Sequence, residues 1–355
     1  MSSAGFEQIA KLPLAGENDS EYNKSAQTDK KMTLPVDTQG VITYRFSTQY
    51  GLLGTARLDV ARNTFHAKAD SGLKSIGLGE IGGQLGQLTY LKKGEYHTNE
   101  EIIIDALRAH TVGSSDEPWI VRRLVAPKLL EGQHHPRVYR QESGPNPRAL
   151  YGREYTDNVV AFENLQRRLE ELFRVLEPDS TNDTAYGHSL RELIILACTE
   201  VELLWKQLLR ANHYGGGTQP QRFSTNDYIK TKDALFLDGW EIALEDYPDY
   251  ARITPFKGWD PSHPTQSLEF YDGYNAVKHS RDTEFRRATL KNAVTAVAAV
   301  YVLLGAQFGF KLGDFSSLED GPGVFRWSKV PVFPLEEQYI PPARGKGWTA
   351  VGRQF

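Results

Sequence analysis

The stretch from residue 267 to residue 309 constrains the fold of this chain more than any other, and we interpret it as two consecutive helices. Its second half, residues 293–306, is apolar on nearly every side. A helix of this kind must be enclosed by other elements or by lipid, and this run is too short to span a bilayer. We therefore expect a buried core helix, with an amphipathic helix that carries a polar patch beside it.

Length and charge exclude some classes of protein. The 355 residues favour two domains, or one domain with large extensions. The formal charge is 41 − 45 = −4, which argues against a protein that coats nucleic acid non-specifically, because such a protein needs a large basic excess. A local basic patch is compatible with this balance.

The cysteine count and the first residues bear on cofactors and compartment. Cys198 is the single cysteine, so an intramolecular disulfide and multi-cysteine zinc sites are excluded. We expect no cofactor and no bound metal. Residues 1–35 lack the apolar segment of a secretory signal. These features predict a cytoplasmic protein without a membrane association.

Composition and periodicity divide the chain into four regions. Residues 1–35 are polar and predict a flexible arm. Residues 36–150 predict a small α+β or irregular region, and residues 151–312 a helical bundle. Residues 313–355 predict an extended tail that packs on the surface. The boundary near residue 150 lies in a segment rich in proline, glycine, histidine and arginine.

Short β-favouring runs and one capped helix characterise the second region. A run at residues 85–91 follows a glycine-rich loop, and Thr98 with Glu101 matches a capping box, which predicts a helix that ends near His110. Three earlier runs alternate, or nearly alternate, as half-buried strands do: 41–46, 54–60 and 64–69.

Two motifs of this region resemble a dinucleotide site and a metal site, but their sequence context favours structural roles. Gly77, Gly79 and Gly82 have the spacing of a dinucleotide fingerprint, yet the following residues are poor helix formers, so we expect a flexible turn. His134 and His135 have no carboxylate or cysteine partner nearby in sequence, and we interpret them as loop residues rather than metal ligands. We expect the arginines of the same segment to be solvated: Arg123, Arg137, Arg140 and Arg148.

Apolar spacing predicts helices over residues 160–176 and 186–212. On the second helix, Arg191 and Glu202 are charges bordered by large apolar residues. Since charges near a core are retained when they are paired, they predict either a structural contact, which is an interhelical salt bridge or a capped loop contact, or part of a functional site. Cys198 on the same face is interpreted as a small core residue.

The segments that follow are shorter. Ser224 and Thr225 are expected to cap a short helix, and Trp259 lies in a proline-rich loop where we expect it to be exposed. Thr265 is expected to cap the amphipathic helix. The connection at residues 280–284 is short, which makes the last two helices antiparallel neighbours. Residues 324–333 are a possible strand.

The amphipathic helix carries the polar patch. Asp272, Asn275 and His279 fall within one sector, with Lys278 beside them. Two helical turns separate Asp272 from His279, about 10 Å, so these two cannot bond directly. A histidine beside an amide and a lysine is suited to general acid or base catalysis. The alternative is a polar network that ties this helix to the preceding long helix.

The stretch YNAVKHSR, with CTEVELLWKQLL before it and AVTAVAAVYVLL after it, resembles the HEPN-type domains of prokaryotes. That resemblance implies a small helical bundle, often dimeric. Many such domains are metal-independent ribonucleases of toxin–antitoxin, abortive-infection and CRISPR-linked systems. The longer pattern is similar to bacterial and phage-associated proteins with no assigned activity.

The family signature is an arginine, commonly a polar residue next, and a histidine further along the same helix. Asn275 and His279 match its second and last positions. Tyr274 occupies the arginine position, where the family's arginine steadies the scissile phosphate. Lys278 and Arg281 are other cations nearby, but neither has the matching position.

We therefore predict a mainly α protein with a HEPN-like bundle. Two functions remain open. The first is an RNA-directed defence or stress protein, with a homodimeric assembly and RNA or an antitoxin as partner; His279 is its acid/base group and Asn275 and Lys278 lie on the phosphate side. The supporting residues are Asp272, Arg191 and Glu202. The second is a non-catalytic interaction module. A catalytic His279 is expected to line a cleft, and a structural one to be buried and bonded.

Overall fold

Helix α9 (Leu290–Phe308) is the buried centre of the helical part, as the sequence predicts. The side chain of Thr289 caps its first turn by accepting a hydrogen bond from the Asn292 amide. By length and composition α9 resembles a membrane span, yet 89% of its apolar window is buried inside the protein. It is therefore a core helix of this fold.

The coordinates are a computed structural model, which describes residues 41–49, 53–59, 62, 64–69, 80–84, 98–111, 120–140, 144–215, 222–309, 323–343 and 345–355. The predicted arm at residues 1–35, the run at 85–91, Gly77 and Gly79 lie outside them. Contacts group residues 35–355 into one unit.

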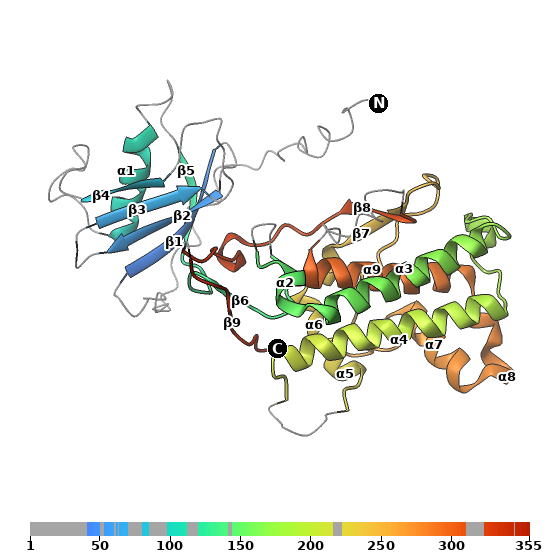
Figure 1. The fold of residues 1–355 in the computed structure, drawn as a ribbon. Helices are drawn as coiled ribbons and strands as arrows, with labels where there is room; N and C mark the ends of the chain where they lie inside the picture. Colours follow the sequence, from blue (N-terminus) through green and yellow to red (C-terminus); the bar gives the residue numbers. More distant parts are fainter. Residues whose placement is uncertain are drawn as a thin grey trace. The chain divides into compact units, whose positions relative to one another are not determined.

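Three further helices surround α9. Helices α3 (Arg153–Phe173) and α4 (His188–Ala211) pack against it and against each other, and α7 (Glu269–His279) packs on both α4 and α9 (Figure 1). Phe162 of α3 stacks on Tyr301 of α9 with ring centres 5.3 Å apart. The apolar periodicity of α3 and α4 thus predicted both helices correctly, because their stripes bury one face each.

The connection from α7 to α9 is longer than predicted. It contains α8 (Arg281–Glu284) and the 3-10 turn η4 (Phe285–Arg287). Helix α7 begins at Glu269, so Thr265 is not its cap; the Thr265 hydroxyl instead lies 2.8 Å from that of Thr225. Trp259 is 1% exposed, so the expectation of an exposed loop residue was wrong.

Short elements complete the helical part. A capping box at Ser224 and Asp227 starts α5, so the Ser224 cap is confirmed. Strand β7 (Glu241–Leu244) pairs antiparallel with β8 (Phe325–Lys329), which lies within the predicted 324–333 run. The remaining short elements are α2 (Pro147–Tyr151), η2 (Ser180–Asn182), α5 (Thr225–Tyr228), α6 (Thr231–Ala234) and η3 (Leu237–Gly239).

The N-terminal region forms a regular antiparallel sheet. Its strand order is β4-β3-β2-β1-β5, and α1 (Asn99–Thr111) packs on it (Figure 1). The Thr98–Glu101 capping box is present in both directions, at 3.3 and 3.2 Å. The strands are β1 (Val41–Thr48), β2 (Leu53–Asp59), β3 (Thr64–Ala69), β4 (Glu80–Gln84) and β5 (Val121–Val125).

This sheet corrects the expected fold class. Of the described residues, 46% are helical and 17% are in strands, so the protein is mixed α/β rather than mainly α. The three predicted strands are confirmed as β1 to β3. Gly82 lies in β4, paired with His66, so it belongs to a strand and not to the expected turn. The error arose because β4 and β5 have no clear alternation of their own and are specified by pairing with their neighbours.

The C-terminal segment returns to the middle of the chain. Its turn η5 (Leu335–Glu337) contacts β1, and β9 (Thr349–Ala350) pairs in parallel with β6 (Gln133–His134). The amide of Val351 donates to the carbonyl of His134 at 2.8 Å. Residues near 134 and 350 therefore form one structural unit despite their separation in sequence.

Candidate functional site

Helix α7 separates an apolar face from the polar patch. Phe270, Tyr271, Tyr274 and Val277 are buried, while Lys278 and His279 in its last turn are exposed. This division follows from the amphipathic spacing of the helix, which turns its aromatic residues toward α4 and α9. The charged end of α7 is thus the part available to a ligand.

Glu202 of α4 joins the two helices. It accepts a hydrogen bond from the Tyr271 hydroxyl at 2.9 Å and another from Lys206, also at 2.9 Å. Burial raises the pKa of Glu202, but the hydrogen bonds from Lys206 and Tyr271 outweigh burial and lower this pKa overall. Glu202 is therefore a charged acceptor that holds α7 on α4.

Lys278 is held by Tyr274, one helical turn earlier on α7. Its ammonium donates to the Tyr274 hydroxyl at 2.7 Å and lies 4.8 Å from the centre of the Tyr274 ring. This hydrogen bond raises the pKa of Lys278. The pair thus fixes a protonated amine at the surface of the α4–α7 contact.

Three other residues of the patch bind within the fold. Asp272 forms an ion pair with Arg287 of η4 at 2.6 Å. Arg191 donates through Nε to the carbonyl of Val277 at 3.0 Å, so it secures the end of α7 to α4 rather than pairing with Glu202. Asn275 donates to the Tyr271 carbonyl of its own helix at 3.1 Å.

His279 differs from these neighbours. It is exposed, and among the described residues it has no hydrogen bond or ion pair. A structural histidine is expected to be buried and bonded, which His279 is not. A catalytic one is expected to line a cleft, and His279 lines neither the cavity around Arg137 nor the one around Phe173. The geometry therefore leaves one unengaged imidazole next to the positioned amine of Lys278.

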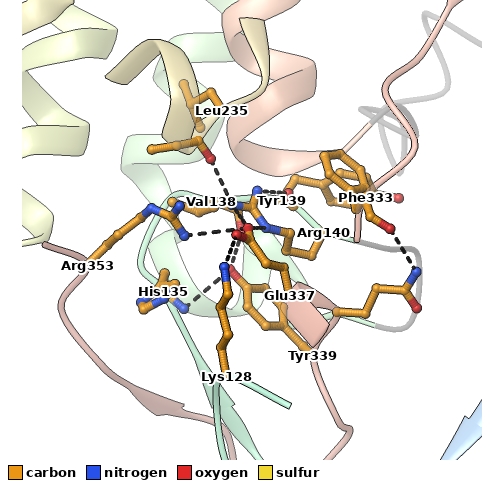
Figure 2. Close-up of polar contacts among 12 residues, drawn as sticks. Lys128, His135, Val138, Tyr139, Arg140, Leu235, Phe333, Glu337, Tyr339 and Arg353 are labelled. Atoms are coloured by element: carbon orange, nitrogen blue, oxygen red, sulfur yellow. Dashed lines mark hydrogen bonds and ion pairs between the residues drawn. The ribbon is translucent and has the colours of Figure 1, made fainter. Parts of the chain in front are cut away.

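A second polar cluster surrounds Arg140, which is fully buried, and the sequence did not predict it. The guanidinium packs against the rings of Phe236 and Phe333, with its central carbon 5.0 and 5.4 Å from their centres, and the two rings also contact each other. It donates to Glu337 at 2.8 Å and to the carbonyl of Ala234 at 2.8 Å (Figure 2). The expected solvated arginine is thus a core residue.

Glu337 is the centre of this second cluster. Besides Arg140, it accepts from Lys128 at 2.6 Å and lies 3.7 Å from Arg353 (Figure 2). Burial raises the pKa of Glu337, and the hydrogen bond from Lys128 together with the charges of Arg140 and Arg353 reverses this and lowers it. The single carboxylate of Glu337 therefore offsets part of the positive charge of Lys128, Arg140 and Arg353.

Arg137 is the other buried arginine, with a left-handed backbone at φ +56°. It donates to Glu154 at 2.6 Å, to Gln207 at 2.8 Å and to Gln307 at 2.7 Å. Burial lowers the pKa of Arg137 to about 10, although the negative charge of Glu154 raises this pKa and offsets part of the effect. It stays protonated at neutral pH and joins α3, α4 and α9.

The adjacent histidines are also built into the fold. His134 lies in β6 and is 4% exposed, and Nδ1 of His135 bonds to the Val351 carbonyl at 2.8 Å. Burial lowers the pKa of both imidazoles. No group of three His, Cys, Asp or Glu side chains could hold a metal ion in the part of the chain that the structure describes.

Sequence reasoning missed this cluster because its members are far apart. Arg140 and Glu337 are 197 residues apart, and no local pattern connects them. The one local signal was the pair of apolar residues, Val138 and Tyr139, between Arg137 and Arg140.

Comparisons with known proteins add no relative: no protein-family model, curated protein or solved structure matches this chain. The HEPN-like resemblance consequently remains a prediction that rests on the residues of α4, α7 and α9.

Proposed function

We propose that this protein is a cytoplasmic HEPN-like protein of a defence or stress response that acts on RNA without a metal ion. The observation that carries the proposal is the state of His279, which is exposed and unengaged beside Lys278. Tyr274 holds the Lys278 ammonium at 2.7 Å. A cation for a phosphate and a group for proton transfer therefore lie on the same turn of α7.

The proposed roles follow from the chemistry of RNA cleavage. A 2′-hydroxyl attacks the neighbouring phosphorus, the bond to the 5′-oxygen breaks, and one proton moves at each oxygen. His279 transfers a proton. Lys278 faces the charge that develops on the phosphoryl oxygens, and the free N–H of Asn275 is a second donor. Lys278 thus takes the place of the signature's arginine.

A second copy of the chain completes this proposal. One imidazole serves only one of the two proton transfers at a time, whereas the two histidines of a homodimer serve both. A twofold interface beside the end of α7 brings them to one phosphate. An antitoxin that covers this end of α7 is the protein partner that fits such an activity.

The test is cleavage of RNA by the purified protein in the presence of EDTA. Total RNA is incubated with the parent protein and with His279→Ala purified in the same way. Cleavage by the parent alone supports the proposal, and equal cleavage by the parent and His279→Ala contradicts the catalytic role of His279. An intact RNA pool with the folded parent contradicts the catalytic role of His279.

The alternative function is a non-catalytic interaction module. It is favoured by the bonds that occupy most of the patch: Asp272 to Arg287, Tyr271 to Glu202, and Arg191 to Val277. Those contacts join α7 to α4 and η4 whether or not catalysis occurs. The same RNA experiment separates the two functions, since an interaction module leaves RNA intact.

A further inference from the structure

Three aromatic side chains form an exposed cluster at the start of α4. Phe285 of η4 lies at its centre, with the His188 ring 4.7 Å away at 41° and the Tyr186 ring 5.8 Å away at 87°. Tyr186 is 48% exposed and His188 is exposed, while Phe285 is partly buried. We call Tyr186, His188 and Phe285 the aromatic platform.

The backbone under the aromatic platform is fixed. Tyr186 forms an antiparallel bridge with Thr289, the cap of α9. On either side, the amide of Leu290 donates to Ala185 at 2.9 Å and that of Gly187 to Ala288 at 3.4 Å. The backbone that carries Tyr186 is therefore tied to the start of α9.

The segment next to the aromatic platform has a small positive charge. Residues 278–287 contain four Lys and Arg and two Asp and Glu, a net charge of 4 − 2 = +2 in a chain whose total is −4. Arg287 is paired with Asp272 outside this segment, which leaves a net charge of 2 − 1 = +1. Arg286 lies 6.0 Å from the centre of the Tyr186 ring and is exposed. It has no ion pair with a described residue, so its charge is available to an anion.

The aromatic platform lies close to the end of α7. His188 is one turn before Arg191 on α4, and Arg191 donates to the carbonyl of Val277 at 3.0 Å. Val277 is two residues before His279. In Figure 1, α8 and the start of α4 lie at the same end of the helical part. A ligand on the rings can therefore extend toward Lys278 and His279.

We infer that the aromatic platform is a base-stacking site for single-stranded RNA, with Arg286 as its phosphate or cation–π contact. The choice of RNA rests on the proposed function. Exposed aromatic rings within a basic surface bind unpaired bases by stacking, independently of sequence. A duplex keeps its bases stacked on one another, so this site discriminates against it.

Binding is measured on the His279→Ala background, so that cleavage does not enter. The probe is a fluorescein-labelled oligoribonucleotide of mixed sequence, single-stranded or annealed to its complement, followed by anisotropy. Tyr186→Ala is expected to weaken binding of the single strand about fivefold or more. The matched control Tyr186→Phe keeps the ring and is expected to stay within about twofold. Arg286→Ala is expected to reduce the salt dependence of binding by about one ion.

Each outcome decides the inference. Unchanged affinity in Tyr186→Ala overturns it, as does equal affinity for duplex and single strand, or no binding by a parent with a normal melt. Tighter binding of the DNA strand of the same sequence overturns the assignment to RNA. If binding depends on the Tyr186 ring but the parent protein cleaves no RNA, the aromatic platform is supported and the proposed ribonuclease activity is contradicted. If the parent cleaves RNA but binding does not depend on the Tyr186 ring, the ribonuclease activity is supported and the aromatic platform is contradicted.

Discussion

The ammonium of Lys278 is hydrogen-bonded to the hydroxyl of Tyr274 at 2.7 Å, one helical turn earlier on α7. Tyr274 itself is buried. The side chain of Tyr274 therefore carries no charge of its own but holds the charged amine of Lys278 in place.

The first prediction tests this pair through Tyr274→Phe. The substitution removes the acceptor for Lys278 and keeps the buried ring, so a loss of about 0.5–1.5 kcal/mol in unfolding free energy is expected. If RNA cleavage depends on the anchored amine of Lys278, the rate of cleavage is expected to fall as well. Urea denaturation and metal-free RNA cleavage measure the two effects. Parental cleavage by a folded Tyr274→Phe protein contradicts a role for the anchored cation.

The second prediction separates His279 from the structural network. Because His279 is exposed and unengaged, His279→Ala should change the unfolding free energy by at most about 0.5 kcal/mol. Tyr271→Phe, which deletes the hydroxyl bonded to Glu202, should cost about 1–3 kcal/mol because it removes a hydrogen bond to a charged group. Thermal and urea melts compare the two. A larger loss for His279→Ala than for Tyr271→Phe would place the histidine in the network.

The third prediction concerns acid pH. The pKa of Glu337 is lowered in the folded state, so the stability that Glu337 contributes is present above its unfolded pKa and is lost as pH falls through the folded value. Glu337→Gln should therefore be less stable than the parent at pH 7, and the difference should shrink below about pH 4. Melts from pH 7 to pH 3 measure this, with exposed Glu171→Gln as control. A pH-independent difference argues against the charge of Glu337 as the cause.

The fourth prediction tests the core helix. Val297 is 0% exposed in α9, and Val332 is 93% exposed. Val297→Asp buries an unpaired carboxylate at a cost of several kcal/mol, comparable to the stability of a whole domain, so the protein should not fold. The same change at Val332 should cost at most about 0.5 kcal/mol. Circular dichroism and soluble yield of both variants provide the comparison.

The fifth prediction is a homodimer through the helical part. Two apolar side chains on α4, Leu196 and Leu203, are exposed. Light scattering at micromolar concentration is expected to give twice the chain mass of 40.0 kDa. A particle of the monomer mass contradicts the dimer, and with it the supply of two histidines to one phosphate.

The sequence predicted elements whose pattern is local. The apolar periods of α3 and α4, the all-apolar run of α9 and the Thr98 capping box each involve residues within a few turns of one another. Strands β1 to β3 were predictable for the same reason, since each alternates within itself. Of the candidate site, the sequence predicted that Asn275, Lys278 and His279 share one helix.

The rest depended on partners distant in sequence. Strand β5 joins the sheet by pairing Arg45 with Val125 across residues that give no pairing signal. Trp259 is buried because it stacks on Trp205 of α4, 5.1 Å away. Arg140 is buried because the C-terminal segment covers it. Burial of this kind follows from long-range packing, which composition and periodicity do not encode.

The pairing of β6 with β9 also determines when, during synthesis of the chain, its middle part can complete its packing. Arg140 leaves the ribosome 197 residues before Glu337, which at about 5–20 residues per second is a wait of roughly 10 to 40 s. During that interval, the surfaces around Arg140 and His134 have neither their carboxylate nor their partner strand. The helices can begin to associate, but the middle of the chain reaches its native packing only after β9 has been synthesised.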